Sequence, residues 1–119
     1  MAKILIAEDD DSMRNFLARA VRRAGYKVVA VDRGTRALPY LAAGDIDLLL
    51  TDIVMPEMDG IELAQRTASL SPGTQVMFIT GFAAVAVNQR NAAPEDAKVL
   101  SKPFHLRDLV DEINRLFAA

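Results

Sequence analysis

The sequence predicts a single-domain α/β protein built around a doubly wound parallel β-sheet with helices on both faces. Two observations support this fold class. Five short apolar runs, most of them rich in β-branched residues, alternate with segments of helical periodicity. Such alternation is typical of βαβ units with right-handed crossovers. The 119 residues suffice for one hydrophobic core and leave no room for a second domain, so we expect one domain over residues 1–119.

The apolar runs are the expected strands. Because they are continuous rather than alternating, they indicate strands that are buried on both faces, as a sheet between two helical layers requires. The expected strands are residues 4–7, 28–31, 46–50, 76–79 and 99–100.

Four segments have the apolar spacing of helices: residues 13–24, 32–43, 61–70 and 106–117. Asp11 or Ser12 is the expected N-cap of the first helix, and Gly25 lies where a terminating glycine belongs. Pro39 is tolerable in the second helix if that helix begins near Arg36.

One segment lacks regular spacing, and one helix face is expected to be exposed to solvent. Residues 82–97 are the least regular part of the chain, because loop-forming residues and a proline interrupt a short helical pattern. The outer face of the first helix is expected to be solvated, and it carries Arg14, Arg19, Arg22 and Arg23.

Composition excludes several classes of function. The formal net charge of −2 argues against a nucleic-acid-binding protein or a polybasic membrane anchor, so we expect neither partner. The absence of cysteine excludes disulfides, thiolate catalysis and cysteine-based zinc sites, and a reducing cytoplasm is the expected location. The first apolar run is too short for a signal peptide or a membrane span.

Polar residues follow four of the expected strands at their carboxyl ends. Glu8 and Asp9 follow the first strand, Asp52 the third, Thr80 the fourth and Lys102 the fifth. The carboxyl ends of parallel strands share one edge of the sheet, where ligands of doubly wound proteins bind. We therefore expect these five side chains to gather in one crevice.

This set of side chains indicates phosphoryl chemistry. Three unpaired carboxylates in one crevice would raise one another's pKa, and a bound cation removes that conflict. Mg²⁺ prefers oxygen ligands and keeps positions open for a phosphoryl oxygen. Asp52 can then act as a nucleophile that forms an acyl phosphate. Lys102 and the Thr80 hydroxyl are placed to bind phosphoryl oxygens.

Each of these signals also has a simpler interpretation. Alone, Glu8 and Asp9 would form an acidic cluster that caps a helix. Thr80 alone would be a strand-end residue bonded to backbone, and Lys102 an exposed lysine. The joint pattern favours the metal and phosphate site.

With these motifs in view, the chain resembles the receiver domains of bacterial two-component response regulators over residues 3–117. The resemblance rests on four motifs: the strand and acidic pair of residues 4–10, the phosphoacceptor strand and loop of residues 50–60, the switch hydroxyl Thr80, and the lysine with its cis-proline loop at residues 102–104. It implies a flavodoxin-like (βα)5 fold with strand order 2-1-3-4-5 and no output domain.

The resemblance also implies roles for individual residues. Asp52 would be the phosphoacceptor, assisted by Thr80 and Lys102. The implied Mg²⁺ ligands are the side chains of Glu8, Asp9 and Asp52 and the backbone carbonyl of Val54. The chain would catalyse only its own phosphorylation and dephosphorylation, and would not otherwise be an enzyme.

A more specific resemblance is to CpdR-type single-domain regulators, carried by residues 78–86, 96–109 and 118–119. It implies a cell-cycle adaptor that delivers substrates to the ClpXP protease through the ClpX unfoldase, with the unphosphorylated form active. A histidine kinase or histidine phosphotransferase would supply the phosphoryl group. The alternative is a stand-alone receiver that shuttles phosphate or binds a kinase without a protease role. We expect a monomer, with weak dimerisation as the alternative.

Three positions leave alternatives open. Val99 stands where receivers usually carry an aromatic switch residue, so we place the output in residues 81–99, with Gly81, Phe82 and Val99 as switch residues. The terminal residues Ala118 and Ala119 are either a frayed helix end or a degradation signal. His105, the only histidine, is expected to be a cap or first-turn residue of the last helix.

Three rival functions fit the sequence less well. A phosphatase of the haloacid-dehalogenase type needs an acid two residues after its aspartate, where this chain has Val54. A DNA-binding regulator needs a basic recognition helix, but the last helix mixes arginines with acidic residues. A degenerate receiver would not be expected to keep the full set of site residues.

Overall fold

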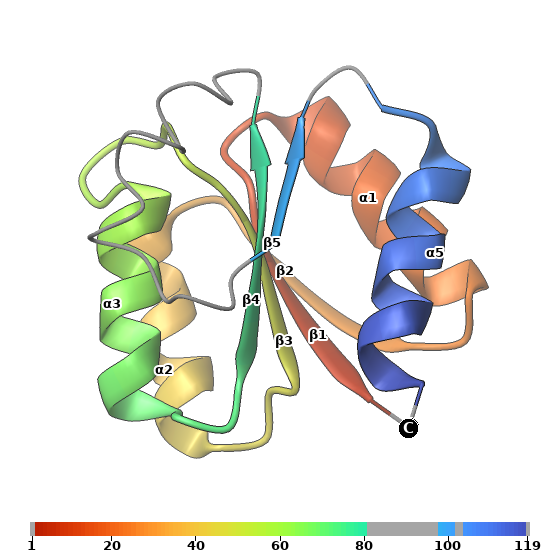
Figure 1. Ribbon diagram of the computed structural model, residues 1–119. Helices are drawn as coiled ribbons and strands as arrows, with labels where there is room; N and C mark the ends of the chain where they lie inside the picture. The colour runs from red at the N-terminus through yellow and green to blue at the C-terminus, as the bar shows by residue number, and fades with distance from the viewer. Residues whose placement is uncertain (1, 81–97, 102–103, 119) are drawn as a thin grey trace.

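The computed structural model describes residues 2–80, 98–101 and 104–118. Its centre is a five-stranded sheet in which all neighbouring strands are parallel (Figure 1). The strands are β1 (Lys3–Ala7), β2 (Lys27–Val31), β3 (Leu48–Asp52), β4 (Gln75–Thr80) and β5 (Lys98–Ser101). Their order is β2-β1-β3-β4-β5, which confirms the predicted flavodoxin-like fold.

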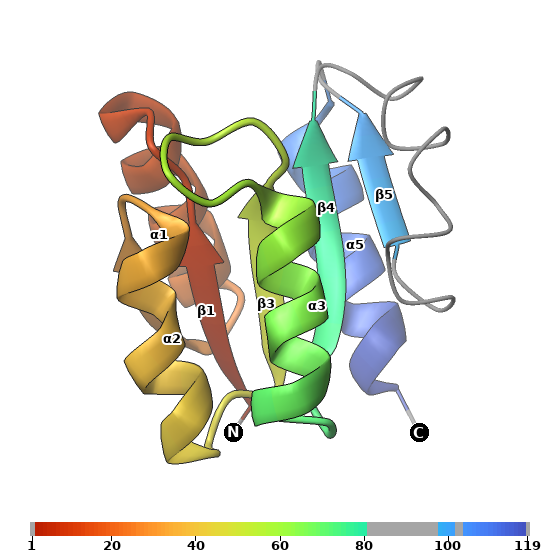
Figure 2. The same ribbon diagram turned by 90° about the vertical axis from the view of Figure 1, so that its left-hand side faces the viewer.

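Helices cover both faces of the sheet. They are α1 (Asp11–Arg23), α2 (Gly34–Ala43), α3 (Gly60–Leu70) and α5 (Leu106–Phe117). Helices α1 and α5 lie on one face, while α2 and α3 lie on the other (Figures 1 and 2). The irregular segment predicted at residues 82–97 lies outside the described residues. Among the described helices, none has the length and apolar character needed to cross a membrane.

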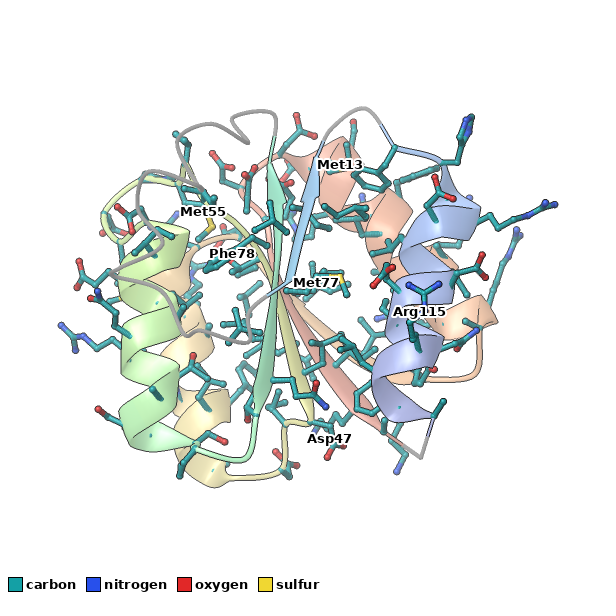
Figure 3. The ribbon with its side chains drawn as sticks, in the orientation of Figure 1. Met13, Asp47, Met55, Met77, Phe78 and Arg115 are labelled. Atoms are coloured by element: carbon teal, nitrogen blue, oxygen red, sulfur yellow. The ribbon has the colours of Figure 1, made fainter. Side chains whose placement is uncertain are left out.

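The core consists of two apolar clusters, one on each side of the sheet. In β1, Ile4 and Ile6 belong to the cluster under α1 and α5, whereas Leu5 belongs to the cluster under α2 and α3. Met77 and Phe78 alternate in the same way in β4, as Figure 3 shows. Successive side chains of a strand point to opposite faces, so burial on both sides explains why the strands are continuously apolar.

The helix boundaries differ from the expectations in two places. The N-cap of α1 is Asp10, which accepts a hydrogen bond of 2.8 Å from the Met13 amide, so the expected cap at Asp11 or Ser12 was wrong by one or two residues. Helix α2 begins at Gly34 rather than near Arg36, which places Pro39 in its second turn. A proline there removes a backbone hydrogen bond. Gly25 has φ 102° and ends α1 as expected.

Candidate functional site

Three carboxylates meet at the carboxyl edge of the sheet, between β1 and β3, which is the switch point at which the strand order reverses. Glu8 and Asp9 directly follow β1, and Asp52 is the last residue of β3. Because β1 and β3 are neighbours, carboxylate oxygens of these three residues lie within 4.8 Å of one another. The structure therefore brings together the three side chains that the sequence offered as metal ligands.

Glu8 is the buried member of this cluster, with only 2% of its surface exposed. Its amide donates to the Val31 carbonyl of β2 at 3.1 Å, and its Oε2 accepts from the Asp10 amide at 3.2 Å. A carboxylate removed from water requires hydrogen bonds or a cation to remain charged. Glu8 is therefore held in place at the inner wall of the site, while Asp9 is exposed at its mouth.

Arg14 of α1 turns back toward the end of β1 and contacts Glu8 and Asp11. Its Nη1 donates to the Glu8 carbonyl at 3.0 Å, and its Nη2 pairs with Asp11 Oδ1 at 2.5 Å. The side chain is 19% exposed, so the expected solvated face was wrong for Arg14, although it holds for the exposed Arg19, Arg22 and Arg23. Helical spacing shows which side of a helix a residue occupies but does not reveal a contact with the preceding loop.

Asp52 is oriented by backbone at the end of β3. Its Oδ1 accepts from the Ile53 amide at 2.7 Å, and the Thr51 hydroxyl donates to its carbonyl at 2.8 Å. The side chain is half-buried, so the carboxylate is fixed and still reachable from solvent. These properties suit a nucleophile, which must be both positioned and accessible.

Gly60 locks the start of α3 against this strand end. Its amide donates to the Ile53 carbonyl at 2.7 Å, and a Cβ at this position would lie 2.1 Å from the Asp52 carbonyl oxygen. Asp59 caps the helix by accepting from the Glu62 amide at 2.8 Å. The Asp59-Gly60 pair thus has a physical role that its place in the family motif did not explain: only glycine permits this close approach.

An ion pair links the two loops beside the site. Arg33 Nη1 contacts Glu57 Oε1 at 3.3 Å, joining the β2–α2 loop to the β3–α3 loop. Glu57 has φ 71°, a left-handed conformation that is uncommon for residues other than glycine. Burial raises the pKa of the neighbouring Asp32 carboxyl, but the charges of Arg36 and Arg33 outweigh it, so this pKa lies below its ordinary value.

The remaining predicted site residues are only partly described. Val54 lies in the loop after β3 with an exposed side chain, and ligation by its carbonyl stays a prediction. Thr80 ends β4 beside Ser101 of β5, one residue beyond the Ile79 that pairs with Asp52, but its side chain is outside the described part. Three other predicted residues are described: Val99 is 39% exposed, Ala118 follows α5, and His105 occupies the N-cap position of α5 without a side-chain cap bond. Outside the described residues lie Gly81, Phe82, Lys102 and Ala119.

The donor set fits a hard divalent cation. All three clustered side chains offer carboxylate oxygens, which Mg²⁺ prefers over nitrogen or sulfur ligands. Glu8 is buried, Asp52 is held by the Ile53 amide, and Asp9 is exposed. A cation bound here would therefore keep one side open to solvent. The cluster could therefore hold an ion such as Mg²⁺.

Comparison with known proteins identifies the family. Residues 4–114 match the model of the response regulator receiver domain. The chain is 59% identical over its full length to the response regulator receiver protein CpdR of Brucella abortus (strain 2308), and the match covers 99% of that protein. It is 35% identical to part of the sensor kinase CckA of the same strain, covering 97% of this chain and 12% of the kinase.

A solved structure agrees with this match. The CheY-like receiver domain protein of Methanospirillum hungatei JF-1 superimposes with a TM-score of 0.87 at 30% identity, over 98% of this chain and 93% of the other. The family match, the CpdR likeness and the clustered carboxylates all point to the same class of protein. The chain belongs to the response regulator receiver domain family.

Proposed function

We propose that this protein accepts a phosphoryl group on Asp52 in a histidine-kinase phosphorelay, with Mg²⁺ held by Glu8, Asp9 and Asp52. The observation that carries the proposal is the convergence of these carboxylates within 4.8 Å at the switch point of the sheet. Carboxylates this close together repel one another electrostatically, and a bound divalent cation would reduce that repulsion. A site for a bound cation and a transferred phosphoryl group would account for this clustering.

The reaction is a transfer between a phosphohistidine donor and the Asp52 carboxylate. An oxygen of Asp52 forms a bond to phosphorus as the phosphorus–nitrogen bond of the donor breaks, and the imidazole leaves with the bond's electron pair and takes up a proton. Mg²⁺, when bound, neutralises charge on the phosphoryl oxygens and the attacking carboxylate. The Ile53 amide holds Asp52 Oδ1 during the attack. The Val54 carbonyl is proposed as a further metal ligand, and Thr80 and Lys102 as the groups that bind the remaining phosphoryl oxygens.

The product is an acyl phosphate that adds about two negative charges to the mouth of the site. We propose that this charge changes the conformation of the segment from Gly81 to Val99 and so switches partner binding. The likeness to CpdR supports the more specific role of an adaptor that engages the ClpX unfoldase when unphosphorylated. The protein would act in the cytoplasm and catalyse no reaction beyond its own phosphorylation and dephosphorylation.

Intact-mass spectrometry tests phosphoacceptance. Incubation with acetyl phosphate and Mg²⁺ should add the mass of one phosphoryl group to the wild type, and chelation of the metal should prevent it. Asp52→Asn should not gain this mass. The matched control is Asp47→Asn, which removes an exposed carboxylate that follows Ile46 at the opposite edge of the sheet and should leave the adduct intact. Equal labelling of wild type and Asp52→Asn would refute the proposal.

A binding assay tests the adaptor role separately. Immobilised ClpX should capture the wild type and Asp52→Ala, but not the wild type held in its phosphorylated form. Capture that does not change on phosphorylation would leave Asp52 as phosphoacceptor and remove the phosphorylation-controlled adaptor.

A further inference from the structure

We propose that Arg14 is a positioning residue for the metal site: it holds the acidic segment of residues 8–11, which runs from the end of β1 to the first residue of α1, in the conformation that presents Glu8 and Asp9 to a cation. This inference rests on the proposed function, because it concerns the Mg²⁺ site named there. It assigns a role to a helix residue that contributes no ligand atom and that the sequence pattern placed on a solvated surface.

The side-chain contacts of Arg14 lie on both ends of this segment. Its two terminal guanidinium nitrogens reach the Glu8 carbonyl in the loop at 3.0 Å and the carboxylate of Asp11, the first residue of α1, at 2.5 Å. Its own amide donates to the Asp10 carbonyl at 2.8 Å as part of the first turn of α1. Arg14 therefore connects the first turn of α1 to Glu8, the residue directly before the proposed ligand Asp9.

Glu8 is restrained at three points, one of which is the contact with Arg14. Glu8 is fixed at its amide by Val31 and at its side chain by the Asp10 amide, so Arg14 supplies the restraint on its carbonyl. The peptide plane that begins with this carbonyl leads directly to Asp9, the exposed ligand. A rotation of that plane would swing Asp9 away from Asp52. Groups that orient metal ligands through hydrogen bonds influence metal affinity strongly.

Arginine has a geometry that lysine cannot reproduce here. The planar guanidinium presents separate N–H groups to two acceptors at once, whereas a lysine ammonium is a single nitrogen on a shorter reach. Arg14→Lys therefore keeps the positive charge and removes the two-point contact. This separates positioning from a simple effect of charge, because removal of a cation beside the site would by itself strengthen Mg²⁺ binding.

The test is a Mg²⁺ titration of the unphosphorylated protein, followed through the amide NMR signals of Glu8, Asp9 and Asp52. Arg14→Lys should bind Mg²⁺ about tenfold more weakly than the wild type. The matched control is Arg36→Lys, which makes the same substitution in an arginine of α2 that pairs with Asp32 at 3.2 Å. Its affinity should stay within about twofold of the wild type.

Thermal unfolding of each variant in a chelator is measured in parallel, so that a general loss of stability is distinguished from a loss of metal affinity. The proposal is overturned if Arg14→Lys binds Mg²⁺ as the wild type does, or if Arg36→Lys weakens binding equally. If the wild type itself binds no Mg²⁺ at these residues, the proposed function fails instead, and the two failures are distinct.

Discussion

Gly60→Ala is the substitution for which the structure gives the sharpest stability prediction. The added Cβ would lie 2.1 Å from the Asp52 carbonyl oxygen, 2.9 Å from the Ile53 Cα and 3.0 Å from the Asp52 carbonyl carbon. All three are backbone atoms of β3 or of the residue after it, so no side-chain rotation relieves the clash. Either α3 must move away from the sheet or the end of β3 must bend.

The expected cost follows from these contacts. Overpacking of a rigid site costs about 1–3 kcal/mol, and the backbone clash places this substitution at the upper end. The higher helix propensity of alanine offsets at most about 1 kcal/mol of this cost. A net loss of about 2 kcal/mol in the free energy of unfolding corresponds to a fall in Tm of roughly 10 °C for a domain of this size. Urea and thermal unfolding followed by far-ultraviolet circular dichroism measure both quantities.

Gly73→Ala is the matched control, because a Cβ there meets nothing within 4 Å. Its free energy of unfolding should change by less than about 0.5 kcal/mol. Because the clash displaces the Asp52 backbone, Gly60→Ala should also be phosphorylated more slowly than Gly73→Ala by acetyl phosphate. A Gly60→Ala protein as stable as the wild type would show that the close approach of α3 and β3 is not as described.

Three further substitutions test local features of the fold by the same unfolding measurements. Asp10→Ala removes the side-chain cap of α1 and should cost about 1 kcal/mol, whereas Ser12→Ala should cost less than half as much; equal costs would contradict the cap assignment. Pro39→Ala restores a backbone hydrogen bond in the second turn of α2 and should stabilise the protein by about 1–2 kcal/mol, and a loss of stability would contradict the placement of that helix. Glu57→Gly relieves the left-handed backbone at φ 71° and gives up an exposed ion pair, so it should stabilise by about 0.5–1 kcal/mol; destabilisation would mean that the Arg33 contact outweighs the strain.

The sheet could be predicted from sequence because its strands are buried on both faces. Burial on both sides favours apolar residues at successive positions of a strand, so Ile4 to Ala7 and Leu48 to Leu50 are conspicuous in the sequence. The polar residues that follow then mark the carboxyl edge, which is how Glu8, Asp9 and Asp52 were found together. The strand order came from the family resemblance, because no local pattern specifies which strands are neighbours.

Other features depend on three-dimensional contacts that a pattern does not encode. The cap of α1 shifted to Asp10 because three consecutive aspartates, at positions 9–11, offer equivalent side chains and the loop geometry selects among them. Helix α2 begins at Gly34 although Pro39 disfavours it, since Gly34 is itself buried together with Ala37 and Leu41. Arg14 was assigned to solvent because one of its partners, the Glu8 carbonyl, lies in the loop that precedes its own helix.

The most direct test of the central claim replaces Mg²⁺ with paramagnetic Mn²⁺ and maps the broadening of amide NMR signals. If Glu8, Asp9 and Asp52 hold one divalent cation, broadening will centre on these residues and their neighbours at the carboxyl edge of the sheet, and it will disappear in Asp52→Asn. Broadening centred instead on the exposed carboxylates of Asp45 and Asp47, which precede β3 at the opposite edge, or unchanged by Asp52→Asn, would contradict the account.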